Sequence, residues 1–226
     1  MSGGGPRYEP FEHKPVEAES LLLDVRKEKI DRVVEQRTRT FTVVLDRLED
    51  SFNMAAVLRT CEAMGVQEVH VVINPDAPFL PNSRVAQGCD KWLDVKQYKS
   101  FADCREHLKG RGFALYASAI REGSTSLYSL RFDTKIAIVF GNERYGVSDE
   151  VLNTVDGTFW IPMRGFSQSI NISAAASACV SRAIAWREEH LGKVGDLTPV
   201  EAQELRERFY VLAVKQRKRI FKGKRP

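Results

Sequence analysis

Short runs of β-branched and aromatic residues recur along this chain, and segments with helical periodicity lie between them. The strand-like runs are Phe41–Leu45, Val69–Ile73, Trp92–Val95, Phe113–Ala117, Lys135–Phe140 and Phe159–Ile161. Helical spacing is clearest in Met54–Met64, which stops at Gly65, and in the Ala- and Ser-rich segment Asn171–His190. Strands that alternate with helices favour an α/β fold, with a mostly parallel sheet flanked by helices.

Composition divides the chain into four parts. Residues 1–15 are rich in Gly and Pro and are expected to be disordered. Residues 16–40 predict a helical extension that ends before Phe41, and residues 41–192 hold the α/β pattern. Residues 193–226 predict a separate helix, from Pro199 to about Val214, followed by a basic tail.

The net charge of +4 comes from one end of the chain. Residues 215–226 contain seven basic and no acidic residues, whereas the rest contains 27 basic and 30 acidic residues. A basic arm on a mildly acidic body indicates a polyanionic partner, with nucleic acid as the first candidate.

Several classes of protein are disfavoured by the sequence. The four cysteines and four histidines are scattered without a close pair, which argues against a metal site. No apolar run approaches the roughly 18 residues of a membrane span, and the polar N-terminus is not a secretory signal. We therefore expect a cytoplasmic protein with reduced thiols and no membrane partner.

Ligands of parallel α/β sheets bind beyond the carboxyl ends of the strands, where three segments fall: Asp46–Asn53, Gly141–Gly146 and Pro162–Asn171. The loop Gly141–Ser148 matches a phosphate-binding loop except that Val147 replaces the lysine. Glu143 in the same loop would repel a triphosphate. The loop therefore favours a neutral or cationic ligand.

The same segments carry a more specific pattern. Asn53-x5-Arg59, Gly141-Asn-Glu143-x-x-Gly146, and Ile161-Pro-Met163 followed by Ser169-Ile-Asn171-Ile-Ser173 resemble the three motifs of the SpoU branch of the SPOUT RNA methyltransferases. Within that branch, Leu58-Arg-Thr-Cys61, Lys91-Trp92 and residues 167–173 are most similar to the enzymes that methylate guanosine 18 of tRNA. The resemblance implies a sheet with a C-terminal trefoil knot, a homodimer, and methyl transfer from S-adenosylmethionine to a ribose 2′-hydroxyl.

The resemblance also implies roles for individual residues. The expected catalytic residues are Asn53, Arg59 and Glu143. The expected cofactor-binding residues are Ser118, Gly141, Glu143, Ile161, Met163, Ser169, Ile170 and Asn171. Arginine stays protonated near neutral pH, so Arg59 is expected to bind the adjacent phosphate and the developing alkoxide while a phosphate oxygen or water takes the proton. Glu143 would hold a donor group or orient Arg59, and Asn53 and Asn171 are also plausible helix caps.

Basic residues outside the motifs are candidate RNA contacts. They are Arg26, Lys27, Lys29, Arg32, Arg37, Arg39, Arg84, Lys91, Arg144, Arg164, Lys215, Arg217, Lys218 and Arg219. Two alternatives stay open at this point. One is the same reaction on ribosomal RNA or another tRNA position, and the other is a catalytically silent RNA-binding protein.

Overall fold

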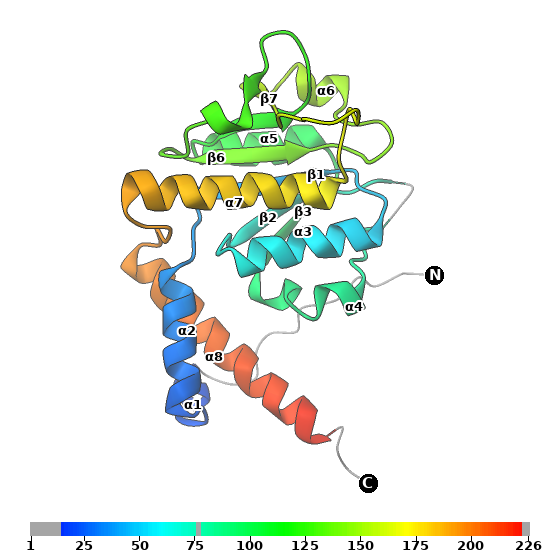
Figure 1. The fold of residues 1–226 in the computed structure, drawn as a ribbon. Coiled ribbons are helices and arrows are strands. Elements are labelled where there is room, and N and C mark those ends of the chain that lie inside the picture. Colours follow the sequence, from blue (N-terminus) through cyan, green and yellow to red (C-terminus); the bar gives the residue numbers. More distant parts are fainter. Residues whose placement is uncertain (1–14, 76–77, 223–226) are drawn as a thin grey trace. The chain divides into compact units, whose positions relative to one another are not determined.

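The computed structural model describes residues 15–75 and 78–222, so most of the segment expected to be disordered lies outside the described residues (Figure 1). The chain forms two compact units. One comprises Gln36–Asp196 and holds the sheet. The other joins the residues up to Glu35 with those from Leu197 onward.

The sheet has seven strands in the described part of the chain, and every pairing is parallel. The strands are β1 (Phe41–Asp46), β2 (Glu68–Val72), β3 (Asp94–Tyr98), β4 (Ala114–Ser118), β5 (Thr125–Ser126), β6 (Ile136–Phe140) and β7 (Gly157–Trp160). Their order is β3-β2-β1-β6-β4-β7-β5, which confirms the predicted parallel α/β sheet. Because β1 adjoins β6 and β4 adjoins β7, the loops that follow these strands meet in pairs at the carboxyl edge. The trefoil knot stays a prediction.

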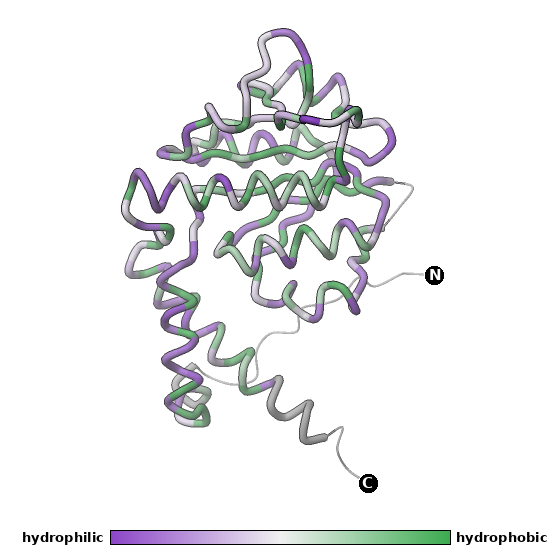
Figure 2. The backbone as a smooth tube through the Cα atoms, viewed as in Figure 1, coloured by the Kyte–Doolittle hydropathy of each residue, from purple (hydrophilic) through white to green (hydrophobic). Residues whose placement is uncertain are grey.

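Helices cover both faces of the sheet. They are α3 (Ser51–Ala63), α4 (Ser83–Ala86), α5 (Phe101–Gly110), α6 (Asp149–Leu152) and α7 (Ile172–Leu191), with short 3-10 turns η1 (Asp90–Trp92) and η2 (Leu127–Ser129). Side chains alternate along β1: Val43 and Leu45 pack with α3 and α7, whereas Val44 packs with α5. The hydrophobic colour along β6, and the α7 and α3 helices lying beside each other, mark this core (Figures 1 and 2).

The end of α3 explains one glycine of the sequence. Gly65 has a φ of +83°, and a Cβ at this position would lie 2.5 Å from the carbonyl oxygen of Gln36. Only glycine fits both the left-handed backbone and this close approach. The prediction that the helix stops at Gly65 is therefore confirmed.

The second unit differs from the predicted division of the chain. It consists of α1 (Pro15–Ser20), α2 (Asp24–Glu35) and α8 (Pro199–Lys222), and both N-terminal helices contact α8. An ion pair of 2.7 Å joins Asp31 on α2 to Arg206 on α8. The predicted N- and C-terminal extensions thus form one unit, and α8 continues well beyond Val214.

Two predicted RNA contacts lie in the sheet-bearing unit instead of on a helix. The helix predicted to reach Arg39 ends at Glu35. Arg37 is only 1% exposed, and its guanidinium donates to the carboxylate and backbone carbonyl of Glu62. Its assignment to RNA binding is wrong, because a buried guanidinium with these partners cannot reach a phosphate. Arg39 is partly buried and pairs with Asp94 at 2.7 Å.

A buried carboxylate joins the amino ends of β2 and β3. Glu68 is 2% exposed and pairs with Arg111 and Lys96, with Arg39 Nη1 at 3.7 Å. Burial alone would raise the pKa of Glu68, but His70 and Arg111 together with the nearby cations hold it well below its usual value. The carboxylate is therefore ionised at neutral pH, and its partners depend on that charge.

We predict that Glu68→Gln destabilises the protein by about 3 kcal/mol, because it leaves several partly buried cations without their shared anion. Urea unfolding monitored by circular dichroism measures the change. Glu122→Gln, on an exposed loop, is the control and should alter the unfolding free energy by less than about 0.5 kcal/mol. A loss below about 1 kcal/mol for Glu68→Gln would contradict the stabilising role.

Candidate active site at the carboxyl edge of the sheet

Hydrogen bonds connect the three sequence motifs at the carboxyl edge. The Glu143 carboxylate accepts from the backbone N–H groups of Glu49 at 3.1 Å and Asp50 at 3.2 Å. It also accepts from Asn53 Nδ2 at 3.2 Å. Asn53 Oδ1 in turn accepts from Asn171 Nδ2 at 2.9 Å. Asn53, Glu143 and Asn171, here called the motif triad, therefore form one continuous chain of hydrogen bonds.

The two asparagines of the triad differ in their local roles. Asp50 is the cap of α3, because its Oδ1 accepts from the amides of Phe52 and Asn53. The Asn53 side chain is buried and bonds to Glu143 and Asn171, so the capping role predicted for Asn53 is wrong. Asn171 does cap its helix: its Oδ1 accepts from Ser173 N at 2.8 Å while its Nδ2 reaches Asn53.

The glycines of the Glu143 loop serve the loop itself. A Cβ at Gly141 would lie 2.2 Å from the carbonyl oxygen of Gly146. Asn142 and Gly146 exchange two backbone hydrogen bonds across this turn, at 2.9 and 2.8 Å. Gly141 thus permits a close approach of backbone to backbone. It is buried and does not line the cavity described next.

A cavity of about 300 Å³ lies among the loops that follow β4 and β7. Its lining consists of Ser118, Ala119, Ile120, Phe159, Trp160, Ile161, Met163, Gln168, Ser169, Ile170 and Ala175. It therefore contains Ser118, Ile161, Met163, Ser169 and Ile170 of the predicted cofactor set, but not Gly141, Glu143 or Asn171. A wider pocket adjoins it and shares Trp160, Met163 and Ser169.

Sequence reasoning missed part of this lining. Trp160 is the last residue of β7 and is 36% exposed, and Ile120 follows β4 by two residues. Their position just beyond the strand ends, where ligands of parallel sheets bind, could have identified both. Trp160 was instead included in a core strand.

Arg59 lies apart from the triad. Its exposed side chain donates from Nη1 to the carbonyl of Val85, in α4, at 3.4 Å. Six positions separate Arg59 from Asn53 along α3, which turns the two side chains about 120° apart around the helix axis. In this structure Glu143 binds Glu49, Asp50 and Asn53, and not Arg59.

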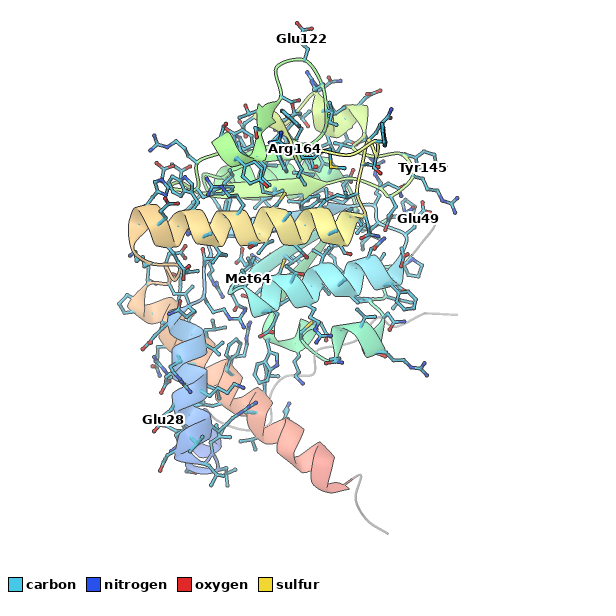
Figure 3. All side chains as sticks on the ribbon, viewed as in Figure 1. Glu28, Glu49, Met64, Glu122, Tyr145 and Arg164 are labelled. Carbon is cyan, nitrogen blue, oxygen red and sulfur yellow. The ribbon has the colours of Figure 1, made fainter. Side chains whose placement is uncertain are left out.

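The remaining basic candidates occupy several surfaces. Lys29, Arg32, Arg84, Arg144 and Arg164 are exposed, and Arg26 is half-buried. Arg164 lies on the loop after β7 (Figure 3). Lys27 pairs with Asp24, and the Lys91 ammonium lies 5.4 Å from the centre of the Trp92 ring. Lys215 is half-buried, and the side chains of Arg217, Lys218 and Arg219 lie outside the described residues.

The described part of the chain contains no cluster of three His, Cys, Asp or Glu residues able to hold a metal ion. No helix in residues 15–75 and 78–222 is long and apolar enough to cross a membrane.

The fold and site define a class: a parallel α/β protein whose loops after β4 and β7 line a cavity beside the motif triad. The sequence profile of the SpoU rRNA Methylase family matches residues 40–181, and the chain belongs to this family. The protein is therefore a methyltransferase of the SpoU type, as the motifs predicted.

Individual relatives agree with this assignment. A tRNA (guanosine(18)-2′-O)-methyltransferase of Thermus thermophilus is 35% identical over 71% of this chain and 82% of its own length. The enzyme of the same name from Borreliella burgdorferi is 33% identical over 86% of this chain and 88% of its own length. The crystal structure of an Aquifex aeolicus TrmH/SpoU tRNA-modifying enzyme superposes with a TM-score of 0.76 at 26% identity, covering 84% of this chain and 98% of that one.

We predict that Glu143→Gln lowers the rate of RNA methylation about tenfold or more. An amide at this position must turn its NH₂ toward at least one of the three N–H groups that donate to the carboxylate, so the side chain at position 143 loses at least one hydrogen bond to the β1–α3 segment. Because the side chain is exposed, the unfolding free energy should change by less than about 1 kcal/mol. Glu150→Gln, on the neighbouring helix α6, is the control and should keep full activity. Equal rates for the two variants would contradict the role of Glu143.

Proposed function

We propose that this protein uses S-adenosylmethionine to methylate the 2′-hydroxyl of guanosine 18 in the D-loop of tRNA. The observation that carries the proposal is the motif triad, which lies beside an uncharged cavity in a chain of the SpoU family. The names of the Thermus and Borreliella relatives supply the tRNA position.

The chemistry of the cavity suits the proposed methyl donor. S-adenosylmethionine combines an adenosine body with a sulfonium cation, which a neighbouring positive charge would repel. None of the described residues that line the cavity is charged, and its walls are largely apolar side chains such as Ile161 and Ile170. The backbone groups of the loops after β4 and β7 would hydrogen-bond the adenine. The protein's contribution is thus to bind the donor and present its methyl group.

The ribose hydroxyl needs a partner that favours its alkoxide. His70, His107 and His190 lie neither in the triad nor among the described residues that line the cavity. We therefore assign to Arg59 the binding of the adjacent phosphate and of the developing negative charge, while a phosphate oxygen or a water accepts the proton. Asn53 and Asn171 would orient the ribose, and Glu143 would hold Asn53.

The position of Arg59 is relevant to the oligomeric state of the protein. Within one chain its guanidinium is held at α4 and does not line the cavity. We propose that the protein acts as a homodimer in which Arg59 of one copy approaches the cavity of the other. The exposed position of this side chain on α3 supports the proposal.

Basic side chains on several surfaces would bind the phosphates of the RNA. Exposed Lys29 and Arg32 on α2, with Arg84, Arg144 and Arg164 near the site, can contact phosphates, and the basic tail from Lys215 would add affinity. We expect the protein to act in the cytoplasm, where tRNA is available. The second candidate substrate is ribosomal RNA, which the description of the matched family favours.

Incubation with unmodified tRNA transcripts and methyl-labelled S-adenosylmethionine, followed by mapping of the modified nucleotide, tests the proposed reaction. We expect label on the ribose of guanosine 18. A transcript carrying 2′-deoxyguanosine at this position is the control and should accept none. Label on ribosomal RNA alone would favour the second candidate, whereas label on a base would contradict ribose methylation.

We further predict that Arg59→Lys lowers kcat at least about tenfold, because an ammonium cannot bind a phosphate and an alkoxide through two parallel hydrogen bonds. Rapid-quench measurement of methyl transfer gives the rate. Arg131→Lys is the control, since Arg131 is exposed and pairs with the nearby Asp133. A near-normal kcat in Arg59→Lys would contradict bidentate binding.

A further inference from the structure

We infer that Asn142, which precedes Glu143, is a positioning residue that fixes the Glu143 carboxylate against the loop between β1 and α3. The inference rests on the proposed function, because the triad is its target. Asn142 touches neither the cavity nor the other triad side chains, so it would act only through Glu143.

The Asn142 side chain uses its whole hydrogen-bonding capacity. Its Nδ2 donates to the carbonyl of Arg47 at 2.9 Å and to Glu49 Oε1 at 3.1 Å. Its Oδ1 accepts from the backbone N–H groups of Arg144 at 2.8 Å and Tyr145 at 3.2 Å. A primary amide has two N–H donors and one oxygen with two lone pairs, so all four positions are filled.

These contacts run in two directions. The Oδ1 contacts shape the turn that carries Glu143, whereas the Nδ2 contacts attach this turn to the β1–α3 loop. Glu49 contributes from both sides, since its backbone N–H donates to Glu143 while its carboxylate accepts from Asn142. Asn142 and Glu143 therefore make a reciprocal pair of bridges between the two loops.

Arg47 supplies independent support from its backbone. It has a φ of +55°, a left-handed conformation that residues other than glycine rarely adopt. Both backbone groups of Arg47 are hydrogen-bonded in this conformation. Its N–H donates to the carbonyl of Val72 at 3.0 Å, and its carbonyl accepts from Asn142 Nδ2. The loop is thus fixed in an unfavourable conformation at the point where Asn142 binds it.

The exposure of Glu143 explains why such a bridge is needed. Its side chain is exposed, and its three donors come from Glu49 and Asp50 of the other loop and from Asn53 in the first turn of α3. Without the Asn142 bridge, the turn could move relative to that loop and the carboxylate would lose its donors together. The cavity after β4 and β7 would be unaffected.

The Asn142→Asp substitution separates the contacts made by Oδ1 from those made by Nδ2. Asn142→Asp keeps an oxygen for the amides of Arg144 and Tyr145, but it removes both N–H donors and faces the Glu49 carboxylate with a second negative charge. Glu49→Gln in this background places an amide opposite the new carboxylate, so the contact between positions 49 and 142 re-forms with donor and acceptor exchanged, whereas the contact to the Arg47 carbonyl stays lost. Glu49→Gln alone keeps its oxygen for Asn142 and is the matched control.

The experiment measures kcat, the KM for tRNA, the Kd for S-adenosylmethionine and the NMR amide exchange of Glu49 and Asp50 in all four proteins. For Asn142→Asp we expect kcat to fall about tenfold or more, a donor Kd within about twofold of wild type, and faster exchange of both amides. The double variant should recover at least about threefold in kcat, and Glu49→Gln should resemble wild type.

Three outcomes would overturn the inference: unchanged kcat and amide exchange in Asn142→Asp, a parallel loss of donor affinity and fold, or no recovery in the double variant. The amide readout does not depend on catalysis. If wild type transfers no methyl group while the exchange of Glu49 and Asp50 responds as expected, the proposed function fails and the positioning role is supported.

Discussion

The pairing of β1 with β6 is the constraint on which the site depends. These strands are distant in sequence, yet Val44 lies opposite Val139 and Leu45 opposite Phe140 in a parallel register. Both strands therefore end at the same edge, and the loops that leave them start a strand spacing apart. Every bond between the Glu143 turn and the residues around Asn53 follows from this adjacency.

The Glu143 carboxylate serves as an anchor in this arrangement. Two backbone N–H groups and the Asn53 amide donate to it, so three of the roughly four acceptor positions of the carboxylate are filled. Its effect passes through Asn53 to Asn171, the cap of α7, and α7 begins directly after the loop that lines the cavity. One carboxylate thereby connects the β1 side of the site to the side that holds the cavity.

The fold was largely predictable because buried parallel strands have an unambiguous sequence pattern. Ile136–Phe140 and Phe41–Asp46 are fully buried on both faces. The first is an unbroken apolar run, and the second is apolar except for Thr42 and the terminal Asp46. The motifs likewise identified the triad and five residues of the cavity lining. The interaction of α1 and α2 with α8 was not predictable, since helical periodicity shows that a face is apolar but not which distant helix covers it. The prediction that Arg37 binds RNA was wrong for a related reason. Its partner Glu62 is distant in sequence, so no local pattern distinguishes Arg37 from an exposed arginine.

The amino edge of the sheet carries ion pairs that stabilise the fold, and the carboxyl edge carries the candidate active site. At the amino edge, Glu68 pairs with several cationic side chains. The Asp196 carboxylate accepts from the backbone N–H of Arg39 and from the guanidinium of the buried Arg187, both at 2.7 Å. Such buried charges are costly to leave unpaired, so this edge is strongly fixed. At the carboxyl edge the motif triad consists of two neutral amides and an exposed carboxylate, and its hydrogen bonds each contribute little to folding. Residues at the carboxyl edge can therefore serve binding and orientation, while the ion pairs at the amino edge hold the strands in place.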